Sequence, residues 1–233
     1  MSSFNAQIQF AYTSNNHITW RFNCLFLIIV VVFYSSCNSK DSSDTYKGSA
    51  YSDEVFKISP QSIPGKLQCE YYDDGGEGVA YHDIDSHNNG SGNLNKGADY
   101  LNNFRKNEAV DISFTKFHDS IDNSKYNFVQ PEESQLYIGW TAPGEWTKYT
   151  VEVKKPGLYQ VGIMYTANDH GQISLAINDV DVTGPQDILS TFVKDDSLDW
   201  RQWHHWNYLE NINEIGLQKE CKPLLYIPLI TDR

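Results

Sequence analysis

The sequence predicts an all-β protein with an antiparallel β-sandwich fold, and three observations support this prediction. Short stretches such as Trp146–Val153 come close to alternating apolar and polar residues, as a half-buried strand does. Turn signals, among them Pro156-Gly157 and Gly184-Pro185, separate such stretches. No segment of useful length shows the helical apolar period of about 3.6 residues. With 233 residues, the chain is long enough for one sandwich with a sizeable core.

The predicted strands follow one another through most of the chain. They are Lys66–Tyr72, Ala109–Phe114, Leu136–Trp140, Glu145–Val153, Leu158–Thr166, Gln172–Ile177, Ile188–Val193, Trp203–Leu209, Ile212–Leu217 and Leu224–Ile230. The long loop Asp73–Asp99 is dense in Gly, Asn and Asp, and loops of this length inside a compact domain are usually functional or disordered. In Leu136–Val153 two predicted strands flank the turn Ala142-Pro143-Gly144, with a tryptophan on each side of it.

The N-terminal residues 1–37 are predicted to be a targeting segment. Arg21 precedes the apolar run Leu25–Tyr34, which is short for a bilayer span and has the length of a signal-peptide core. Two serines and then Cys37 follow, which resembles a bacterial lipoprotein box with Cys37 as the acylated residue. We therefore expect an exported protein, either secreted or an outer-membrane or cell-surface lipoprotein whose only membrane contact is its lipid. An ordinary signal or membrane anchor is the alternative. The polar residues 38–61 are predicted to be a tether.

Charge and cysteine content narrow the function further. The formal net charge of −12 argues against a nucleic-acid partner, because phosphate binding requires clustered Lys and Arg. An acidic balance suits a neutral ligand, calcium or solubility. Beyond the targeting segment only Cys69 and Cys221 remain, and their pairing is left open. The absence of a Cys/His ligand spacing makes a zinc site improbable.

Several motifs, taken together and in this order, resemble a family 6 carbohydrate-binding module. They are Ile63–Asp83, Phe104-Arg105 followed by Ala109–Ile112, Ile138–Val153, Pro156–Tyr165 and Asp199–Leu217. The resemblance covers residues 62–233. It implies a jelly-roll, galactose-binding-like β-sandwich that binds carbohydrate without catalysis and is usually attached to bacterial polysaccharide-degrading enzymes.

The resemblance also implies a cleft at the loop edge of the sandwich, where Trp140 and Trp200 hold a sugar ring between them. The axial C–H face of a pyranose is apolar, so a flat indole gains by covering it. Glu77, Tyr81 and His82 are the expected readers of the sugar hydroxyls, which provide selectivity more than affinity.

Other aromatic residues are open to two interpretations. Trp146 matches a tryptophan that forms a second cleft on the concave sheet face in some family members, although packing in the core is the preferred interpretation. Trp203 and Trp206 are expected to pack in the core. His204 and His205 are expected to be ordinary surface and edge histidines, because neighbouring strand residues point to opposite faces.

A structural calcium ion is the one cofactor that the resemblance implies. The matching positions are Gln68 and Glu70, on one face of the first predicted strand, with a backbone carbonyl near Arg105 as a further ligand. Their oxygen atoms suit a hard cation. The alternative is that Gln68 and Glu70 form the solvated face of an edge strand.

The C-terminal part departs from the family pattern. The resemblance leads one to expect an Asn-bearing loop and a last strand with an Asp after Ile230, and the module is therefore expected to be truncated, with an unpaired sheet edge.

The expected ligand is a polysaccharide or oligosaccharide of the β-glucan, xylan or agar type. An alternative is a glycoside hydrolase, which needs two carboxylates flanking the scissile bond; Glu77 and Asp83 are the pair considered. The acidic residues lie mainly in predicted loops, so this alternative is not favoured. A third possibility is an adhesion sandwich that binds another protein through exposed aromatic residues.

Overall fold

The computed structural model describes residues 7–13, 46–218 and 224–230 of the chain. The apolar run Leu25–Tyr34, the predicted lipidation site Cys37 and Cys221 lie outside these residues. Within the described ranges, no helix is both long enough and apolar enough to span a membrane.

Short strands dominate the structure. They are β1 (Gln7–Tyr12), β2 (Gln61–Ile63), β3 (Gly65–Gln68), β4 (Tyr81–His82), β5 (Ile112–Phe114), β6 (Leu136–Ile138), β7 (Trp146–Val153), β8 (Gly157–Tyr165), β9 (Gly171–Ile173), β10 (Ala176–Ile177), β11 (Val180–Asp181), β12 (Gln186–Ile188), β13 (Asn207–Leu217) and β14 (Leu224–Ile230). The single described α-helix, α1, spans Tyr100–Asn103.

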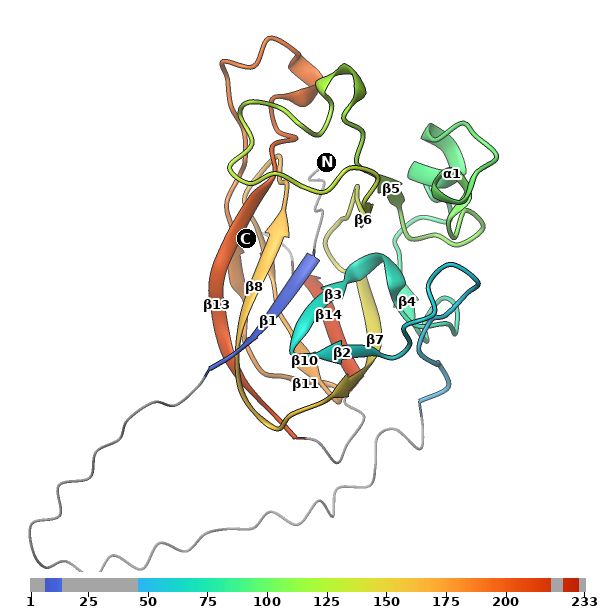
Figure 1. Cartoon of the computed structure of the whole chain (residues 1–233), viewed down its shortest axis with the longest axis vertical. Helices are drawn as coiled ribbons and strands as arrows, with labels where there is room; N and C mark the ends of the chain where they lie inside the picture. Colours follow the sequence, from blue (N-terminus) through green and yellow to red (C-terminus); the bar gives the residue numbers. More distant parts are fainter. Residues whose placement is uncertain (1–6, 14–45, 219–223, 231–233) are drawn as a thin grey trace, which may run out of the picture.

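The strands form two main sheets, and the prediction of an all-β sandwich is confirmed. One sheet has the order β13-β8-β1-β3, and the other has the order β11-β10-β14-β7-β2, with β4 also beside β7, β9 also beside β14, and β12 beside β9 (Figure 1). Neighbouring strands are antiparallel except for β2 and β7, which are parallel. A small pair, β5 and β6, leads toward the loop end of the sandwich.

Strict alternation along the strands builds the core. In β7 every second residue is buried, from Thr147 to Val153. In β8 the buried series includes Tyr159, Val161 and Ile163, each at 0% exposure. Burial of such side chains stabilises the sandwich by about 25 cal/mol per Å² of apolar surface.

The sandwich also contains a strand from the segment predicted to be a signal. Strand β1 lies between β8 and β3, with Ile8 opposite both Ile163 and Leu67. Ile8 and Phe10 are buried at 0% and 1% exposure, respectively. Residues 7–12, which the prediction places in the targeting segment, thus pair within this sheet in the described chain.

Several predicted strands differ in the structure. Strand β3 ends at Gln68, and Cys69–Tyr71 forms a 3-10 turn. Residues 189–193 are not a strand, while the two strands predicted between Trp203 and Leu217 are a single strand, β13, with a register irregularity between Leu209 and Asn213.

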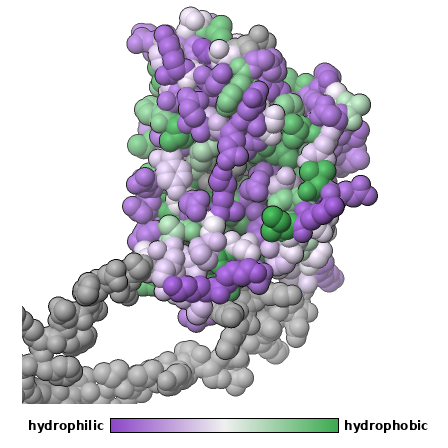
Figure 2. Space-filling model, viewed as in Figure 1, coloured by the Kyte–Doolittle hydropathy of each residue, from purple (hydrophilic) through white to green (hydrophobic). Residues whose placement is uncertain are grey.

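Two long loops meet at one end of the sandwich, at the top of Figure 1. One connects β5 to β6 and the other connects β12 to β13. The Phe128 amide donates to the Trp206 carbonyl at 2.8 Å, and the Tyr126 hydroxyl donates to the Asp195 carbonyl at 2.8 Å. On the face shown in Figure 2, hydrophilic and hydrophobic residues are intermixed.

Candidate functional site

A cleft of about 640 Å³ opens at this loop end, and Trp140 and Trp200 both line it. We call it the Trp140–Trp200 cleft. Its other lining residues are Leu94, Asn95, Lys96, Asn102, Ser113, Phe114, Lys116, His118, Ile121, Asp122, Tyr137, Trp203 and His204. The structure thus brings together the two tryptophans that the sequence analysis paired.

Trp140 is held in an unusual backbone conformation just after β6. Its φ angle is +49°, a left-handed value that a bulky residue rarely adopts. The Gly139 amide donates to the Asp111 carbonyl at 2.9 Å. On the other side, the Glu145 carboxylate accepts from the Ala142 amide at 2.8 Å and closes the turn. The backbone thereby presents the indole to the cleft.

Trp200 comes from the long loop between β12 and β13, where it lies in the 3-10 turn Asp199–Arg201. Its side chain is 53% exposed. The next residue, Arg201, is buried and donates to both carboxylate oxygens of Asp196, at 2.6 and 2.9 Å, and to the Ser120 carbonyl. An exposed indole next to a fixed backbone anchor is available to a ligand.

Asp122 organises the base of the cleft. Its Oδ1 accepts from Trp206 Nε1 at 2.9 Å and contacts His204 Nε2 at 2.8 Å, while Oδ2 accepts from the Lys116 amide at 2.7 Å. Burial alone would raise the pKa of Asp122, but these hydrogen bonds and the nearby His204 hold that pKa below its ordinary value.

The prediction that His204 and His205 are surface histidines is wrong. They are 7% and 0% exposed. His204 is drawn inward by Asp122, and His205 Nε2 lies 3.5 Å from Asp196 Oδ2, with burial lowering the His205 pKa. Both carboxylates come from loops whose convergence leaves no local sequence pattern.

Trp203 and Trp206, the other two tryptophans near Trp200, differ in burial. Trp206 is fully buried, as predicted. Trp203 is half-buried and lines the cleft, so its assignment to the core is wrong. The 3-10 turn just before Trp203 breaks the strand alternation on which that assignment rested.

Polar residues of the cleft come mainly from positions that the sequence analysis did not single out. Asn95 and Lys96 follow the π-helical turn Gly90–Leu94, and Lys116 follows β5. Lys116 Nζ donates to Asn95 Oδ1 and to Ser113 Oγ, each at 3.2 Å. The one sequence signal for them is that Asn95 and Lys96 belong to the long Gly- and Asn-rich loop expected to be functional.

The three expected hydroxyl readers do not line the Trp140–Trp200 cleft. Glu77 and His82 contact each other through Oε1 and Nδ1, and both are about half-exposed. Tyr81 is 5% exposed, packs edge-on against Tyr72 at 5.4 Å, and accepts from the Ala109 amide at 3.5 Å. Because Tyr81 is buried in the core, the structure does not bring it to the cleft.

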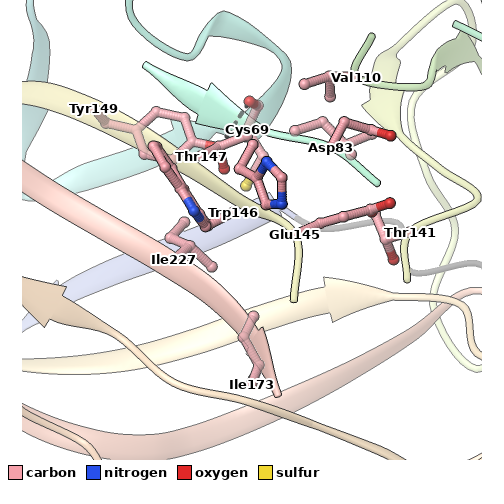
Figure 3. A pocket seen from close by; sticks show the side chains of 12 residues that line it. Cys69, Asp83, Val110, Thr141, Glu145, Trp146, Thr147, Tyr149, Ile173 and Ile227 are labelled. Atoms are coloured by element: carbon pink, nitrogen blue, oxygen red, sulfur yellow. Dashed lines mark hydrogen bonds between the residues drawn. The ribbon is translucent and has the colours of Figure 1, made fainter. Parts of the chain in front are cut away.

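Trp146 lies elsewhere, beside a pocket of only about 40 Å³. In β7 it shares a face with Lys148 and not with the buried Tyr149, so its assignment to the core is wrong. Its ring meets Tyr226 edge-on at 5.3 Å and lies 6.3 Å from the His82 ring. Figure 3 shows Trp146 and Tyr149 on one side of this pocket and the polar Asp83, Glu145 and Thr141 on the other.

Three carboxylates line either this pocket or the hollow next to the cleft: Asp111 and Glu145 are buried, and Asp83 is half-buried. Burial, the largest cause, raises the pKa of Asp83 to about 6, of Asp111 to about 7 and of Glu145 to about 8. Repulsion from neighbouring carboxylates adds to each shift: from Asp85 and Glu77 at Asp83, from Asp83 and Asp85 at Asp111, and from Asp83 and Asp111 at Glu145. Asp111 and Glu145 line a second hollow of about 850 Å³, with Asp85 as a third carboxylate. We call it the acidic hollow. It shares Trp140, Leu94 and Lys96 with the Trp140–Trp200 cleft.

The predicted calcium ligands fit a cation in part. Glu70 is fully buried, its Oε2 has no hydrogen-bond partner among the described atoms, and burial raises its pKa to about 8. Gln68 donates to Glu70 Oε1 at 3.2 Å. The alternative of a solvated strand face is wrong, since Glu70 lies in a buried 3-10 turn.

The third predicted ligand is a backbone carbonyl near Arg105. The Arg105 carbonyl itself accepts from the Glu108 amide at 3.0 Å and from Asn88 Nδ2 at 3.5 Å. Over the described residues, no group of three or more His, Cys, Asp or Glu side chains is arranged to hold a metal ion. The donors that fit calcium are therefore Glu70 and, after rotation of its amide, Gln68.

The sequence matches no known protein family model, and no curated protein is found that matches it significantly.

Proposed function

We propose that this sandwich binds carbohydrate without catalysis and holds a sugar ring between Trp140 and Trp200. The observation that carries the proposal is that these two indoles, from separate loops, line one cleft of about 640 Å³. That volume lies within the usual range for small-molecule sites, about 300–1,000 Å³.

The chemistry of the cleft favours a sugar over an apolar ligand. Trp200 is exposed and Trp203 is half-buried, and such surfaces gain about 25 cal/mol for each Å² of apolar sugar face that they cover. Asn95, Asn102 and His118 bring amide and imidazole groups to the same cleft. Groups of this kind hydrogen-bond hydroxyls and orient the ring.

The ligand class that we propose is a polysaccharide or oligosaccharide such as β-glucan, xylan or an agar-type glycan. The biological role is to hold a secreted or lipid-anchored polysaccharide-degrading system on its substrate. A calcium ion at Glu70 and Gln68 is proposed as structural, since it would neutralise a buried carboxylate. Neither the carbohydrate binding nor the structural calcium ion requires this chain to catalyse a reaction.

Titration calorimetry and affinity electrophoresis with soluble oligosaccharides test the proposal. We expect Trp140→Ala and Trp200→Ala each to lower the affinity at least tenfold. Phe128→Ala removes an exposed aromatic side chain outside the cleft and is expected to leave it unchanged. Binding that survives both tryptophan substitutions but is lost in Trp146→Ala would move the site to the opposite pocket. Release of reducing sugar by the pure protein would favour an enzyme.

A further inference from the structure

The described side chains of the Trp140–Trp200 cleft have a charge opposite to that of the chain. The formal net charge of the protein is −12. The cleft is nevertheless lined by Lys96, Lys116 and His118, with Asp122 as the one described carboxylate. A basic site on an acidic protein attracts anionic ligands.

Asp122 does not neutralise this site at its surface. It is 1% exposed, and its oxygens are already occupied by Trp206, His204 and the Lys116 amide. Its carboxylate therefore stabilises the buried contacts between the loops, and a ligand in the cleft would contact Lys96 and Lys116 rather than Asp122.

The two cleft lysines lack the carboxylate partners that three lysines elsewhere in the described chain have. Lys66, Lys148 and Lys154 each lie within 3.2 Å of a carboxylate oxygen. Neither Lys96 nor Lys116 makes an ion pair with any described residue.

The half-buried ammonium of Lys116 has only neutral acceptors: Asn95 Oδ1, Ser113 Oγ and the Phe114 carbonyl, each at 3.2 Å. Burial lowers its pKa. The charge of the buried Asp122 offsets this lowering only in part. A partly desolvated charge without a direct ion-pair contact is unfavourable, and an anion nearby would relieve that cost.

Asn95 supplies an unused donor beside these lysines. It is 8% exposed, and its Nδ2 has no hydrogen-bond partner among the described atoms. Its Oδ1 accepts from both Lys116 and Ser113, which orients the amide nitrogen away from them. A buried amide nitrogen without an acceptor costs about 1–3 kcal/mol, so an acceptor oxygen on a ligand would be stabilising here.

The neighbouring acidic hollow carries Asp85, Asp111 and Glu145. Lys96 lines both hollows, whereas Lys116 and His118 line only the cleft, so an acid group on the ligand would be drawn toward Lys116 and away from Asp85. The two neighbouring hollows, which share Trp140, therefore orient a charged sugar in one direction.

We infer that the sugar held between Trp140 and Trp200 is acidic, a pyranose with a carboxylate or a sulfate that lies toward Lys96, Asn95 and Lys116. This inference rests on the proposed carbohydrate binding and specifies its substrate class.

The test compares acidic and neutral trisaccharides with the full chain by calorimetry, at low and high sodium chloride. The acidic probes are an oligogalacturonate and a sulfated galactan, and the neutral probe is the unsulfated galactan. We expect at least one acidic probe to bind more tightly than the neutral probe, and we expect salt to weaken this binding. Comparison of the oligogalacturonate with the sulfated galactan identifies whether the acid group is a carboxylate or a sulfate. Lys96→Gln should reduce that affinity about fivefold, the upper range for an exposed ion pair. Lys154→Gln, an exposed lysine outside the cleft, should leave it unchanged.

The outcomes separate the two proposals. Equal or tighter binding of the neutral trisaccharide, still dependent on Trp140, would overturn the acidic-sugar inference and leave carbohydrate binding intact. Acidic binding that is unaffected by Lys96→Gln and by salt would also overturn the inference. No binding of any sugar, or binding independent of Trp140 and Trp200, would overturn the proposed cleft itself.

Discussion

Arg201 and Asp196 form a buried two-point ion pair. Arg201 Nε lies 2.6 Å from Asp196 Oδ2, a second guanidinium nitrogen lies 2.9 Å from Oδ1, and the Asp196 side chain is completely inaccessible. Arg201 directly follows Trp200, so its pair with Asp196 in the same loop fixes the turn that carries the exposed indole, and its hydrogen bond to the Ser120 carbonyl joins this loop to the loop between β5 and β6. The rigidity of one wall of the cleft thus depends on a contact that no ligand touches.

Removing one partner of this pair should destabilise the fold. For Asp196→Asn we expect a loss of about 3–5 kcal/mol in the free energy of unfolding, since the guanidinium is left buried without a counterion. Chemical denaturation measures it. Glu132→Gln, which breaks the exposed pair with Lys66, serves as the control and should cost less than about 1 kcal/mol. Equal effects of the two substitutions would contradict the structural role given to Asp196.

The backbone at Trp140 predicts a difference between two small replacements. Glycine adopts the observed φ of +49° without strain, whereas alanine keeps a Cβ there. Both remove the indole and should abolish sugar binding, but Trp140→Gly should be more stable than Trp140→Ala by about 1 kcal/mol. Thermal unfolding of the two variants provides the comparison, and a more stable alanine variant would contradict the left-handed conformation.

Stability should depend on pH through Glu145. Burial raises the pKa of Glu145 in the folded state from 4.5 to about 8. Between these two pH values, the folded state holds a proton that the unfolded state has already released. The stabilisation is complete below pH 4.5 and is lost as the pH rises through about 8. Glu145→Gln should therefore gain stability relative to the wild type as the pH rises. A difference in Tm that stays constant over this range would refute the assignment.

The orphaned carboxylate of Glu70 predicts a calcium response. We expect calcium to raise the Tm and EDTA to lower it, and we expect Glu70→Gln to abolish both effects, because a neutral amide binds the ion weakly. Glu133→Gln, on an exposed loop position, should retain the full response. A calcium response that persists in Glu70→Gln would place the ion elsewhere, and no response in the wild type would remove calcium from the proposal.

Strand β1 should contribute measurably to stability. Phe10→Ala removes a side chain that is 1% exposed and is expected to lower the free energy of unfolding by about 3–5 kcal/mol. Gln9→Ala, at the neighbouring position with the opposite orientation, should change it by less than about 0.5 kcal/mol. Unfolding curves of the full chain that do not distinguish the two variants would show that β1 is not part of the sandwich.

The sequence predicted strands correctly where the pattern of apolar and polar residues within a single strand was sufficient. The bounds of β14 agree with the prediction, and the alternation in β7 identifies Tyr149, Val151 and Val153 as inward-facing. It placed Trp146 incorrectly because a tryptophan was assumed to be buried despite its position in that same alternation. Where a strand shows a clear alternation, whether a residue is buried is better predicted from its place in that alternation than from its residue type.

The cleft was only partly predictable. Trp140 and Trp200 were paired through a family resemblance, since no local pattern relates two residues so far apart in the chain. Lys96 and Asn95 were missed, and His204 was expected at the surface, because the positions of all three depend on loops that meet only in three dimensions. Glu70 was placed on a strand, whereas β3 stops at Gln68 and the turn that follows buries the carboxylate.

The position of β1 has a consequence for maturation. If the chain is processed before Cys37, as its signal-like segment predicts, the cut separates residues 7–12 covalently from the sheet in which they lie between β8 and β3. The order of two events would then determine the product. A chain cut before it folds presents the edges of β8 and β3 to any other strand, including one from a neighbouring molecule, whereas a chain folded before cutting retains its own strand as a noncovalently bound peptide.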